Sequence, residues 1–249
     1  MISKAKIKFL QSLRQNKFRK EYNVFLAEGN INVCDFLKGS LTVKEVYGTS
    51  EWIGKNKGLL KNTSFEEVSS AELERITALK NPSEVVALIE KPAYTLPDLT
   101  QLQNYLLALD DLRDPGNLGT IIRTADWFGI QDIVCSGETV DAFNPKVVQA
   151  TMGSLARVRV HYTSLEEYFG RKPADLKIYG ATLSGVPFET VSKPGKGILL
   201  IGSEAHGISQ TLYPFIDEQI RIPSAPNSGA ESLNAAVATA LVCYEFTRD

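Results

Sequence analysis

A strand–helix–strand pattern is visible in residues 105–136, which read YLLALDDLRDPGNLGTIIRTADWFGIQDIVCS. Two short apolar runs, Tyr105–Leu109 and Asp132–Cys135, flank a longer stretch with helical spacing of apolar residues. Similar apolar runs follow along the chain at residues 177–181, 198–201 and 219–222. Strands that alternate with helices in this way are typical of a mostly parallel sheet covered by helices. The sequence therefore predicts the α/β fold class for residues 105–249.

The residues before this region are expected to form a separate domain. Residues 1–90 mix helical and strand patterns, which fits a small α/β domain, and Val85–Ile89 is typical of a buried strand. Pro92 and Pro97 lie in an aperiodic stretch that suits a connecting segment. We therefore expect a first domain over residues 1–90, a linker over 91–104 and a second domain over 105–249.

The composition is that of an ordinary globular protein with a sizeable core. Of its 249 residues, 43% are hydrophobic and 22% are charged. Neither a signal peptide nor a run of about 18 apolar residues is visible, so we expect a cytoplasmic protein without a membrane span. The three cysteines are far apart, and the chain has only two histidines. This pattern favours buried thiols over a disulfide framework, and we expect no metal site.

Positive charge is concentrated at the start of the chain. The first twenty residues contain seven Lys or Arg residues and no acid, although the whole chain has a net charge of −2. Such a segment is typical of a contact with a polyanion. It is equally typical of a solvated helix face, because Phe9, Leu10 and Leu13 supply an apolar stripe for the opposite side. Charge alone leaves both interpretations open.

Three loops that follow predicted strands carry candidate site residues, because ligands bind at the carboxyl ends of parallel strands. In the first loop, residues 111–130, Pro115 and Gly116 form a turn and a helix begins near Asn117. Asn117 is suited to cap that helix, and Arg123 follows about two turns later. Taken alone, the pair is more simply explained as a helix cap and a surface arginine.

The second and third loops also place polar residues after apolar strands. In residues 198–208 a strand runs into Gly202 and Glu204, where glycine lets the backbone approach a flat ligand closely. In residues 221–238 a strand ends at Pro223 and a helix begins around residue 232, so that free backbone N–H groups face the loop. Helix capping is the alternative explanation for the polar residues there. They are Glu231, Ser232 and Asn234.

In their order along the chain, the three loops resemble the signature motifs of the SpoU family, also called the TrmH family, of RNA ribose methyltransferases. The likeness extends over residues 105–249, and Tyr22–Val33 with the basic start is similar to the family's substrate-binding domain. The resemblance implies the SPOUT fold, with a C-terminal trefoil knot, after a small L30e-like α/β domain. It also implies S-adenosyl-L-methionine (AdoMet) as cofactor and tRNA or rRNA as partner. The implied reaction is methylation of a ribose 2′-hydroxyl, and the implied assembly is a homodimer.

The resemblance also implies roles for individual residues. The implied cofactor-binding residues are Thr182, Leu183, Gly202, Ile222 and Leu233. The implied catalytic residues are Asn117, Arg123, Glu204, Ser232 and Asn234. Because a guanidinium stays protonated, we expect Arg123 to hold a phosphate and stabilise alkoxide charge, with Asn117 and Glu204 orienting it. A role for Arg123 as a base, which accounts of the family allow, is the alternative.

Two features depart from the family's pattern. The loop over residues 224–231 is longer than usual, which leaves its contacts open. His206 stands where the family often has a small residue, and we interpret it as a lining residue rather than a base. A catalytically inactive RNA-binding factor with the same fold is one alternative, against which the retained Arg123 argues. A Rossmann-type nucleotide enzyme ranks last, because the chain has neither the G-x-G-x-x-G nor the P-loop lysine motif.

Overall fold

The computed structural model describes residues 2–79 and 82–248, which divide into two compact units. The first unit contains the residues up to Ala93 together with Asp141–Arg157, and the second contains Tyr94–Val140 and the residues from Val158 onward. Packing thus assigns Asp141–Arg157 to the first unit, although we expected these residues in the second domain from the sequence. The expected linker over residues 91–104 stays a prediction.

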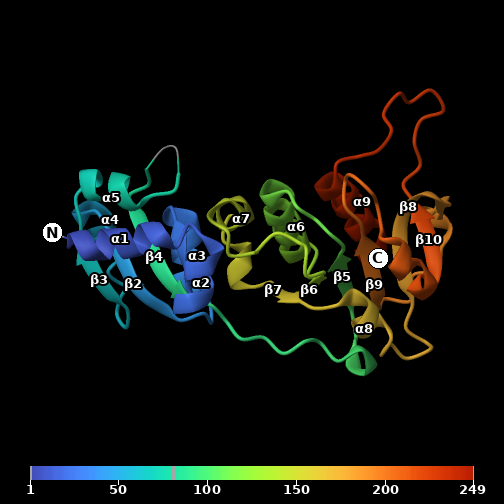
Figure 1. The fold of residues 1–249 in the computed structure, drawn as a ribbon, viewed down its shortest axis with the longest axis horizontal. Helices are drawn as coiled ribbons and strands as arrows, with labels where there is room; N and C mark the ends of the chain where they lie inside the picture. The colour runs from blue at the N-terminus through green and yellow to red at the C-terminus, as the bar shows by residue number, and fades with distance from the viewer. Residues whose placement is uncertain (1, 80–81, 249) are drawn as a thin grey trace. The chain divides into compact units, whose positions relative to one another are not determined.

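The first unit is built on a four-stranded sheet with the order β1-β4-β2-β3 (Figure 1). In this sheet β4 (Val85–Glu90) pairs antiparallel with β1 (Val24–Glu28) and β2 (Val43–Gly48), and β3 (Ser64–Glu67) pairs parallel with β2. The strand expected at residues 85–89 is therefore confirmed as β4. The helices of the unit are α1 (Lys4–Ser12), α2 (Asn16–Tyr22), α3 (Asn30–Lys38), α4 (Ser50–Asn56), α5 (Ser70–Ile76), α7 (Pro145–Thr151) and the 3₁₀ helix η2 (Ser154–Ala156).

The basic start of the chain folds as the amphipathic helix α1. Ser3 caps it, because the Ser3 hydroxyl accepts a hydrogen bond from the Lys6 backbone N–H at 3.1 Å. Leu10 and Leu13 are buried in a core that also contains side chains of β1 and β4. The apolar stripe expected from the sequence is therefore confirmed, and Lys4 and Lys8 lie exposed on the same helix.

The second unit is built on a six-stranded sheet with the order β10-β8-β9-β5-β6-β7, in which every neighbouring pair is parallel. This confirms the predicted α/β fold class. One strand was not expected, because Arg159 and His161 interrupt its apolar pattern. The strands are β5 (Tyr105–Leu109), β6 (Asp132–Cys135), β7 (Arg159–Tyr162), β8 (Ile178–Pro187), β9 (Gly197–Ile201) and β10 (Glu218–Arg221).

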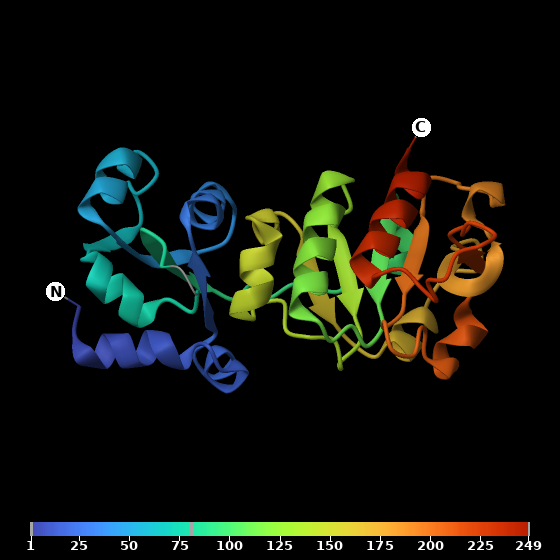
Figure 2. The ribbon, with the colours of Figure 1, turned by 90° about the horizontal axis from the view of Figure 1, so that it is seen from above.

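Helices cover both faces of this sheet. Leu106 and Ala108 of β5 face one side, where they share a core with α8 (Leu165–Phe169) and η4 (Gln210–Phe215). Tyr105 faces the other side, where its ring lies 5.4 Å from that of Phe246 in α9 (Ala235–Thr247). Beside α9 on that side packs α6 (Pro115–Trp127), as Figure 2 shows. Two further 3₁₀ helices are η1 (Leu99–Gln101) and η3 (Phe188–Thr190).

The strand order reverses between β5 and β9. From β5 the chain moves outward through β6 and β7, and it later returns on the other side of β5 to form β8, β9 and β10. At such a reversal the loops leave the carboxyl ends of neighbouring strands in opposite directions, which opens a crevice for ligands. The trefoil knot and the L30e-like character of the first unit stay predictions. No helix of residues 2–79 and 82–248 is long and apolar enough to cross a membrane.

Candidate active site

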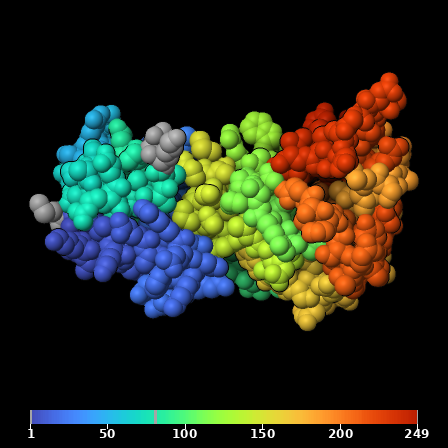
Figure 3. All heavy atoms as spheres, turned by 45° about the horizontal axis from the view of Figure 1, so that its top comes forward, coloured from blue at the N-terminus to red at the C-terminus, as the bar shows by residue number. Residues whose placement is uncertain are grey.

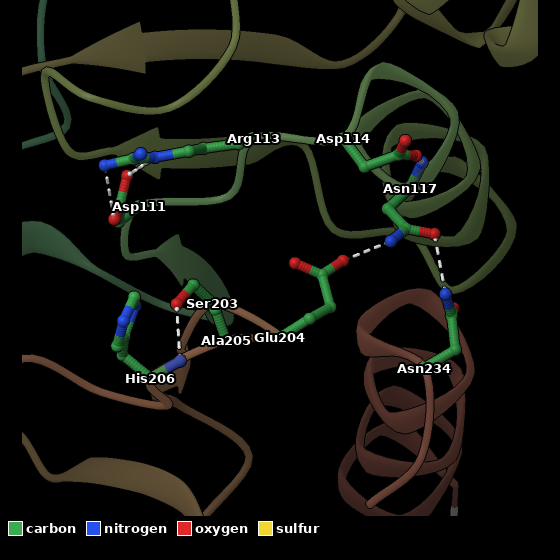
Figure 4. A pocket seen from close by; sticks show the side chains of 9 residues that line it. All are labelled: Asp111, Arg113, Asp114, Asn117, Ser203, Glu204, Ala205, His206 and Asn234. Atoms are coloured by element: carbon green, nitrogen blue, oxygen red, sulfur yellow. Dashed lines mark hydrogen bonds and ion pairs between the residues drawn. The ribbon is translucent and has the colours of Figure 1, made fainter.

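A pocket of about 540 Å³ lies at the carboxyl ends of β5 and β9. Its position is the one that the reversal of strand order predicts. The loop after β5, the loop after β9 and the start of α9 all contribute side chains, so each of the three candidate loops reaches it (Figure 4). The lining residues are Asp111, Arg113, Asp114, Asn117, Ser203, Glu204, Ala205, His206 and Asn234.

Asp114, rather than Asn117, caps the helix that enters the pocket. The Asp114 carboxylate accepts a hydrogen bond from the Asn117 backbone N–H at 2.8 Å, and Pro115 is the first residue of α6. The expectation that Asn117 caps this helix was therefore wrong. The local pattern Asp-Pro-Gly-Asn offers two capping side chains, and the structure uses the earlier one. The Asn117 side chain is left to make contacts in the pocket.

Asn117 joins the three loops through its side-chain amide. Its Nδ2 donates a hydrogen bond to the Glu204 carboxylate, and its Oδ1 accepts one from Asn234 Nδ2 at 2.9 Å. Figure 4 shows these three side chains pointing toward one another, while the second oxygen of Glu204 is turned toward the open middle of the pocket. Because the amide donates on one side and accepts on the other, its orientation is defined by both neighbours.

Asn234 serves two purposes at once. Its Oδ1 accepts hydrogen bonds from the backbone N–H groups of Ala236 and Val237, at 3.0 and 3.3 Å, so it is the N-cap of α9. Its Nδ2 at the same time reaches Asn117. Asn234 therefore both caps α9 and lines the pocket, and its catalytic role stays a prediction. The helix begins at Ala235, later than expected, and Ser232 lies outside it with an exposed side chain.

Two charged residues at the rim were not singled out from the sequence. Arg113 forms a two-point ion pair with Asp111, with Nε–Oδ1 at 2.8 Å and Nη2–Oδ2 at 3.1 Å. Asp111 has a left-handed backbone, with φ of 51°, and its N–H donates to the Ser136 hydroxyl at 2.8 Å. A signal was present in the run of charges Asp-Asp-Leu-Arg-Asp directly after an apolar strand.

Arg123 does not line this pocket. It lies six residues after Asn117 on α6, and at about 100° per residue its side chain leaves the helix on a different face. Its side chain is exposed and has no hydrogen-bond or ion-pair partner among residues 2–79 and 82–248. The structure thus brings together Asn117, Glu204 and Asn234, whereas the catalytic roles of Arg123 and Ser232 stay predictions.

The expected cofactor residues lie on two strands and on the loop before α9. Gly180 pairs with Gln219, but the next pair is Val186 with Ile220, so residues 181–185 of β8 bulge out of the sheet. Thr182 lies in this bulge, and its hydroxyl is buried without a hydrogen-bond partner in the described part of the chain. The neighbouring Leu183 is 76% exposed. The bulge therefore presents an unpaired hydroxyl, that of Thr182, and an exposed apolar side chain, that of Leu183.

The three remaining cofactor residues differ in their surroundings. A Cβ at Gly202 would lie 2.1 Å from the carbonyl carbon of Gly207, so the close return of the loop after β9 by itself requires glycine there. The return is held by two backbone hydrogen bonds between Ser203 and Gly207, at 3.0 and 2.9 Å. Ile222 is half-buried after β10, and Leu233 is 46% exposed before α9.

The cysteines of the second unit are packing residues. Cys135 and Cys243 are buried, and burial raises the pKa of both thiols, to about 12 for Cys243. Neither thiol is therefore ionised near neutral pH, which agrees with the interpretation of these cysteines as inert core residues. In residues 2–79 and 82–248, no group of three or more His, Cys, Asp or Glu side chains is placed to hold a metal ion.

Comparison with known proteins identifies both parts of the chain. Residues 104–244 match the SpoU rRNA Methylase family, and residues 4–87 match the MRM3-like substrate binding domain. The 23S rRNA (guanosine(2553)-2'-O)-methyltransferase RlmP of Bacillus subtilis (strain 168) is 31% identical over 243 residues, which cover 97% of this chain and 95% of the relative. A 23S rRNA (uridine(2479)-2'-O)-methyltransferase of Streptomyces viridochromogenes is 31% identical over 218 residues, which cover 80% of this chain and 72% of the relative.

Solved structures are similar over the full length of the chain. The AdoMet-bound rRNA methyltransferase from Sinorhizobium meliloti has a TM-score of 0.87 at 31% identity, with 99% of this chain and 95% of that chain covered. The SpoU methyltransferase AviRb from Streptomyces viridochromogenes, in complex with AdoMet, has a TM-score of 0.86 at 25% identity, with 98% and 97% covered. With three ordered motifs meeting in one pocket, this chain belongs to the SpoU rRNA methylase family.

Proposed function

We propose that this protein is an AdoMet-dependent RNA methyltransferase that methylates a ribose 2′-hydroxyl of ribosomal RNA in the cytoplasm. The observation that carries the proposal is the hydrogen-bonded set Asn117, Glu204 and Asn234, which unites all three family motifs in one pocket. Relatives that align over most of this chain are named as 23S rRNA 2′-O-methyltransferases. The residue expected to help with the chemistry, Arg123, is present as well.

The expected cofactor-binding residues have the chemistry of an AdoMet site. The buried Thr182 hydroxyl has no hydrogen-bond partner in the described residues, so a ligand atom there would satisfy it. Exposed Leu183 and Leu233 supply apolar surface for a flat ring, and Gly202 and Ile222 complete the expected set. When bound, AdoMet supplies a sulfonium methyl group that a ribose oxygen can attack. AdoMet-bound structures of similar fold support AdoMet as the cofactor.

In the proposed reaction, the pocket orients the ribose. The free oxygen of Glu204 faces the middle of the pocket, where it can accept a hydrogen bond from the 2′-hydroxyl and hold the proton that the hydroxyl loses. Asn117 and Asn234 fix the position of that carboxylate. Transfer requires the reacting oxygen and the methyl carbon in line at about 3 Å, so a fixed ribose lowers the barrier.

The proposed assembly is a homodimer formed through an apolar face of α6 and α9. Trp127 is 84% exposed at the end of α6, and Val237, Leu241 and Tyr244 of α9 are 38–53% exposed. Apolar patches of this kind mark interaction surfaces. Arg123 lies four residues before Trp127, and thus on the same face of α6. Dimer formation would place this guanidinium at the interface, where it can hold an RNA phosphate next to a pocket.

The test is transfer of a tritium-labelled methyl group from AdoMet to ribosomal RNA. RNA from cells that lack this gene should accept label at one ribose, which methylation mapping can locate. RNA from cells that carry the gene is the control, because its site is already methylated and should accept little. A protein that binds AdoMet and RNA but labels neither preparation would be an inactive RNA-binding factor, and the proposal would be wrong.

A further inference from the structure

The outer surface of α1 and α2 combines aromatic rings with positive charge. Among the first 22 residues, Glu21 is the only acid. The buried stripe of α1 accounts for the apolar residues Ile7, Leu10 and Leu13. It does not account for Tyr22, whose side chain is 47% exposed at the end of α2. This helical segment, the darkest blue in Figure 3, is open to solvent in that view.

Three rings are arranged in a fixed cluster on this surface. Phe18 and Tyr22 are one helical turn apart and are stacked, with ring centroids 6.3 Å apart and planes inclined by 12°. Phe9 of α1 meets Tyr22 edge to face, at 5.1 Å and 75°. Phe9 and Phe18 are partly buried against the core of the first unit. The core therefore anchors two rings, and these hold the third in a defined position at the surface.

Free positive charge borders the ring cluster. Lys17 Nζ lies 5.8 Å from the centroid of the Phe18 ring, and Lys20 follows on the same helix with an exposed side chain. Neither lysine has an ion-pair partner in residues 2–79 and 82–248. Lys6 is different, because its Nζ lies 5.6 Å from the Phe9 ring but pairs with Glu45 at 2.6 Å. Lys17 and Lys20 are therefore charges beside the rings that are available to a ligand.

We propose that Phe9, Phe18 and Tyr22, with Lys17 and Lys20, form a stacking platform for an unpaired nucleotide of the substrate RNA. A base has a flat face that stacks on an exposed aromatic ring, and its flanking phosphates pair with lysines. The ligand class follows from the proposed function, on which this inference rests. An anionic membrane fits less well, because the apolar stripe of α1 is already buried and is not free to insert.

The experiment measures binding of a fluorescein-labelled single-stranded RNA of about ten nucleotides to the full chain by anisotropy. Tyr22→Leu should weaken binding about tenfold, because leucine keeps an apolar contact with Phe18 but has no flat ring. Tyr22→Phe should bind like the unchanged protein. The matched control is Phe65→Ala, since Phe65 is a similarly exposed ring (45%) on β3 of the same unit. Thermal unfolding should show that all three variants are folded.

The role of the lysines is tested by the salt dependence of RNA binding. A change in folding would not alter this salt dependence in the same way. Lys17→Gln should lower the slope of log K against log salt concentration by about 0.7, because one fewer phosphate is neutralised. Lys61→Gln, another exposed lysine of the first unit, should leave the slope unchanged. Unchanged single-strand binding in Tyr22→Leu would overturn the platform. The platform would also be overturned if polyglutamate or phosphatidylserine vesicles competed for binding as effectively as unlabelled RNA does.

Failure of the platform and failure of the proposed function give different results. If the unchanged protein methylates RNA but Tyr22→Leu binds single strands normally, the platform is wrong and the activity stands. If Tyr22→Leu weakens binding but the unchanged protein methylates no RNA, the platform stands and the activity is wrong. AdoMet affinity, measured by calorimetry, should be the same for Tyr22→Leu as for the unchanged protein, because Tyr22 belongs to the first unit.

Discussion

Asn117 is available to the pocket because its neighbour Asp114 caps the helix. The Asp114 carboxylate oxygen that accepts the backbone N–H of Asn117 is engaged in capping. Since Asp114 accepts the Asn117 N–H, the Asn117 amide can bridge Glu204 and Asn234. At the level of single residues, capping by Asp114 leaves the Asn117 amide free to join the loops around the pocket.

The role of Arg123 is tested by replacing it. Arg123→Ala should reduce methyl transfer by about 10²–10³-fold, because the developing negative charge loses a hydrogen-bonding cation. AdoMet affinity measured by calorimetry should stay the same, since the exposed side chain of Arg123 does not line the pocket. Arg123→Lys, which keeps the charge but not the two-point geometry, should lie in between. Near-normal turnover of the alanine variant would show that the guanidinium has no part in the chemistry.

Asp132 makes folding stability depend on acidic pH. Burial opposes its charged form, but hydrogen bonds from Arg159 and His161 lower the pKa of Asp132 to about 2. Because this value is below the ordinary 3.8, the contribution is complete above about pH 5 and is lost as the pH falls toward 2. The contribution is about 2 kcal/mol.

The measurement for Asp132 is the free energy of unfolding of the protein and of Asp132→Asn between pH 7 and pH 2. The difference between the two should be constant from pH 7 to about pH 5 and should shrink below pH 4. If the difference in unfolding free energy stays constant down to pH 2, Arg159 and His161 do not stabilise the charged form of Asp132.

At the scale of elements, α6 links the pocket to the apolar surface. Its first turn carries Asn117 into the pocket, and its last turn carries Trp127 to solvent. Phe128 follows directly and meets Tyr244 of α9 edge to face at 6.5 Å, so the two helices present one continuous face. Trp127 follows Asn117 by ten residues, so it lies nearly three helical turns from this pocket residue.

Trp127→Glu should convert the proposed homodimer to monomers. A charge in the centre of an apolar interface is costly, whereas an exposed tryptophan contributes little to folding, so the monomer should stay folded. Sedimentation measures the association, and thermal unfolding checks the fold. Val186→Glu is the matched control, because Val186 is 51% exposed on β8 and lies outside the face. If the unchanged protein sediments as a monomer at micromolar concentration, the proposed assembly is wrong.

At the scale of the whole molecule, the first unit is closed by a segment from far along the chain. The buried guanidinium of Arg19 donates to the Asp141 carboxylate through Nε and Nη2, at 3.0 and 2.6 Å, and to the carbonyl oxygens of Leu13 and Arg14. Arg157 pairs with Asp35 at 2.8 Å in the same unit. Residues 122 positions apart are therefore needed to complete one core.

Arg19→Ala should lower the free energy of unfolding by roughly 3–5 kcal/mol, because it leaves the Asp141 carboxylate without its partner in a largely buried position. Chemical denaturation measures the change. Lys196→Ala, which breaks the exposed pair with Asp175, is the control and should change stability by less than about 1 kcal/mol. An equal, small effect of both substitutions would contradict the importance of the Arg19 network.

The fold class, the order of most strands and helices, and the family can be predicted from the sequence alone. These follow from local information, because apolar spacing and the order of motifs are both written along the chain. The sequence also identified Asn117, Glu204 and Asn234 as candidates. It could not separate a cap from a site residue, since Asp114 and Asn117 are both suited to capping.

Which distant residues meet depends on how the strands pair in the folded protein. Asn117 contacts Glu204 and Asn234 across 87 and 117 positions because β9 pairs beside β5, and strand pairing over such separations leaves no mark in local spacing. For the same reason, the packing of Asp141–Arg157 with the first unit is not visible in local spacing. Side-chain periodicity determines the elements, whereas long-range pairing determines the site.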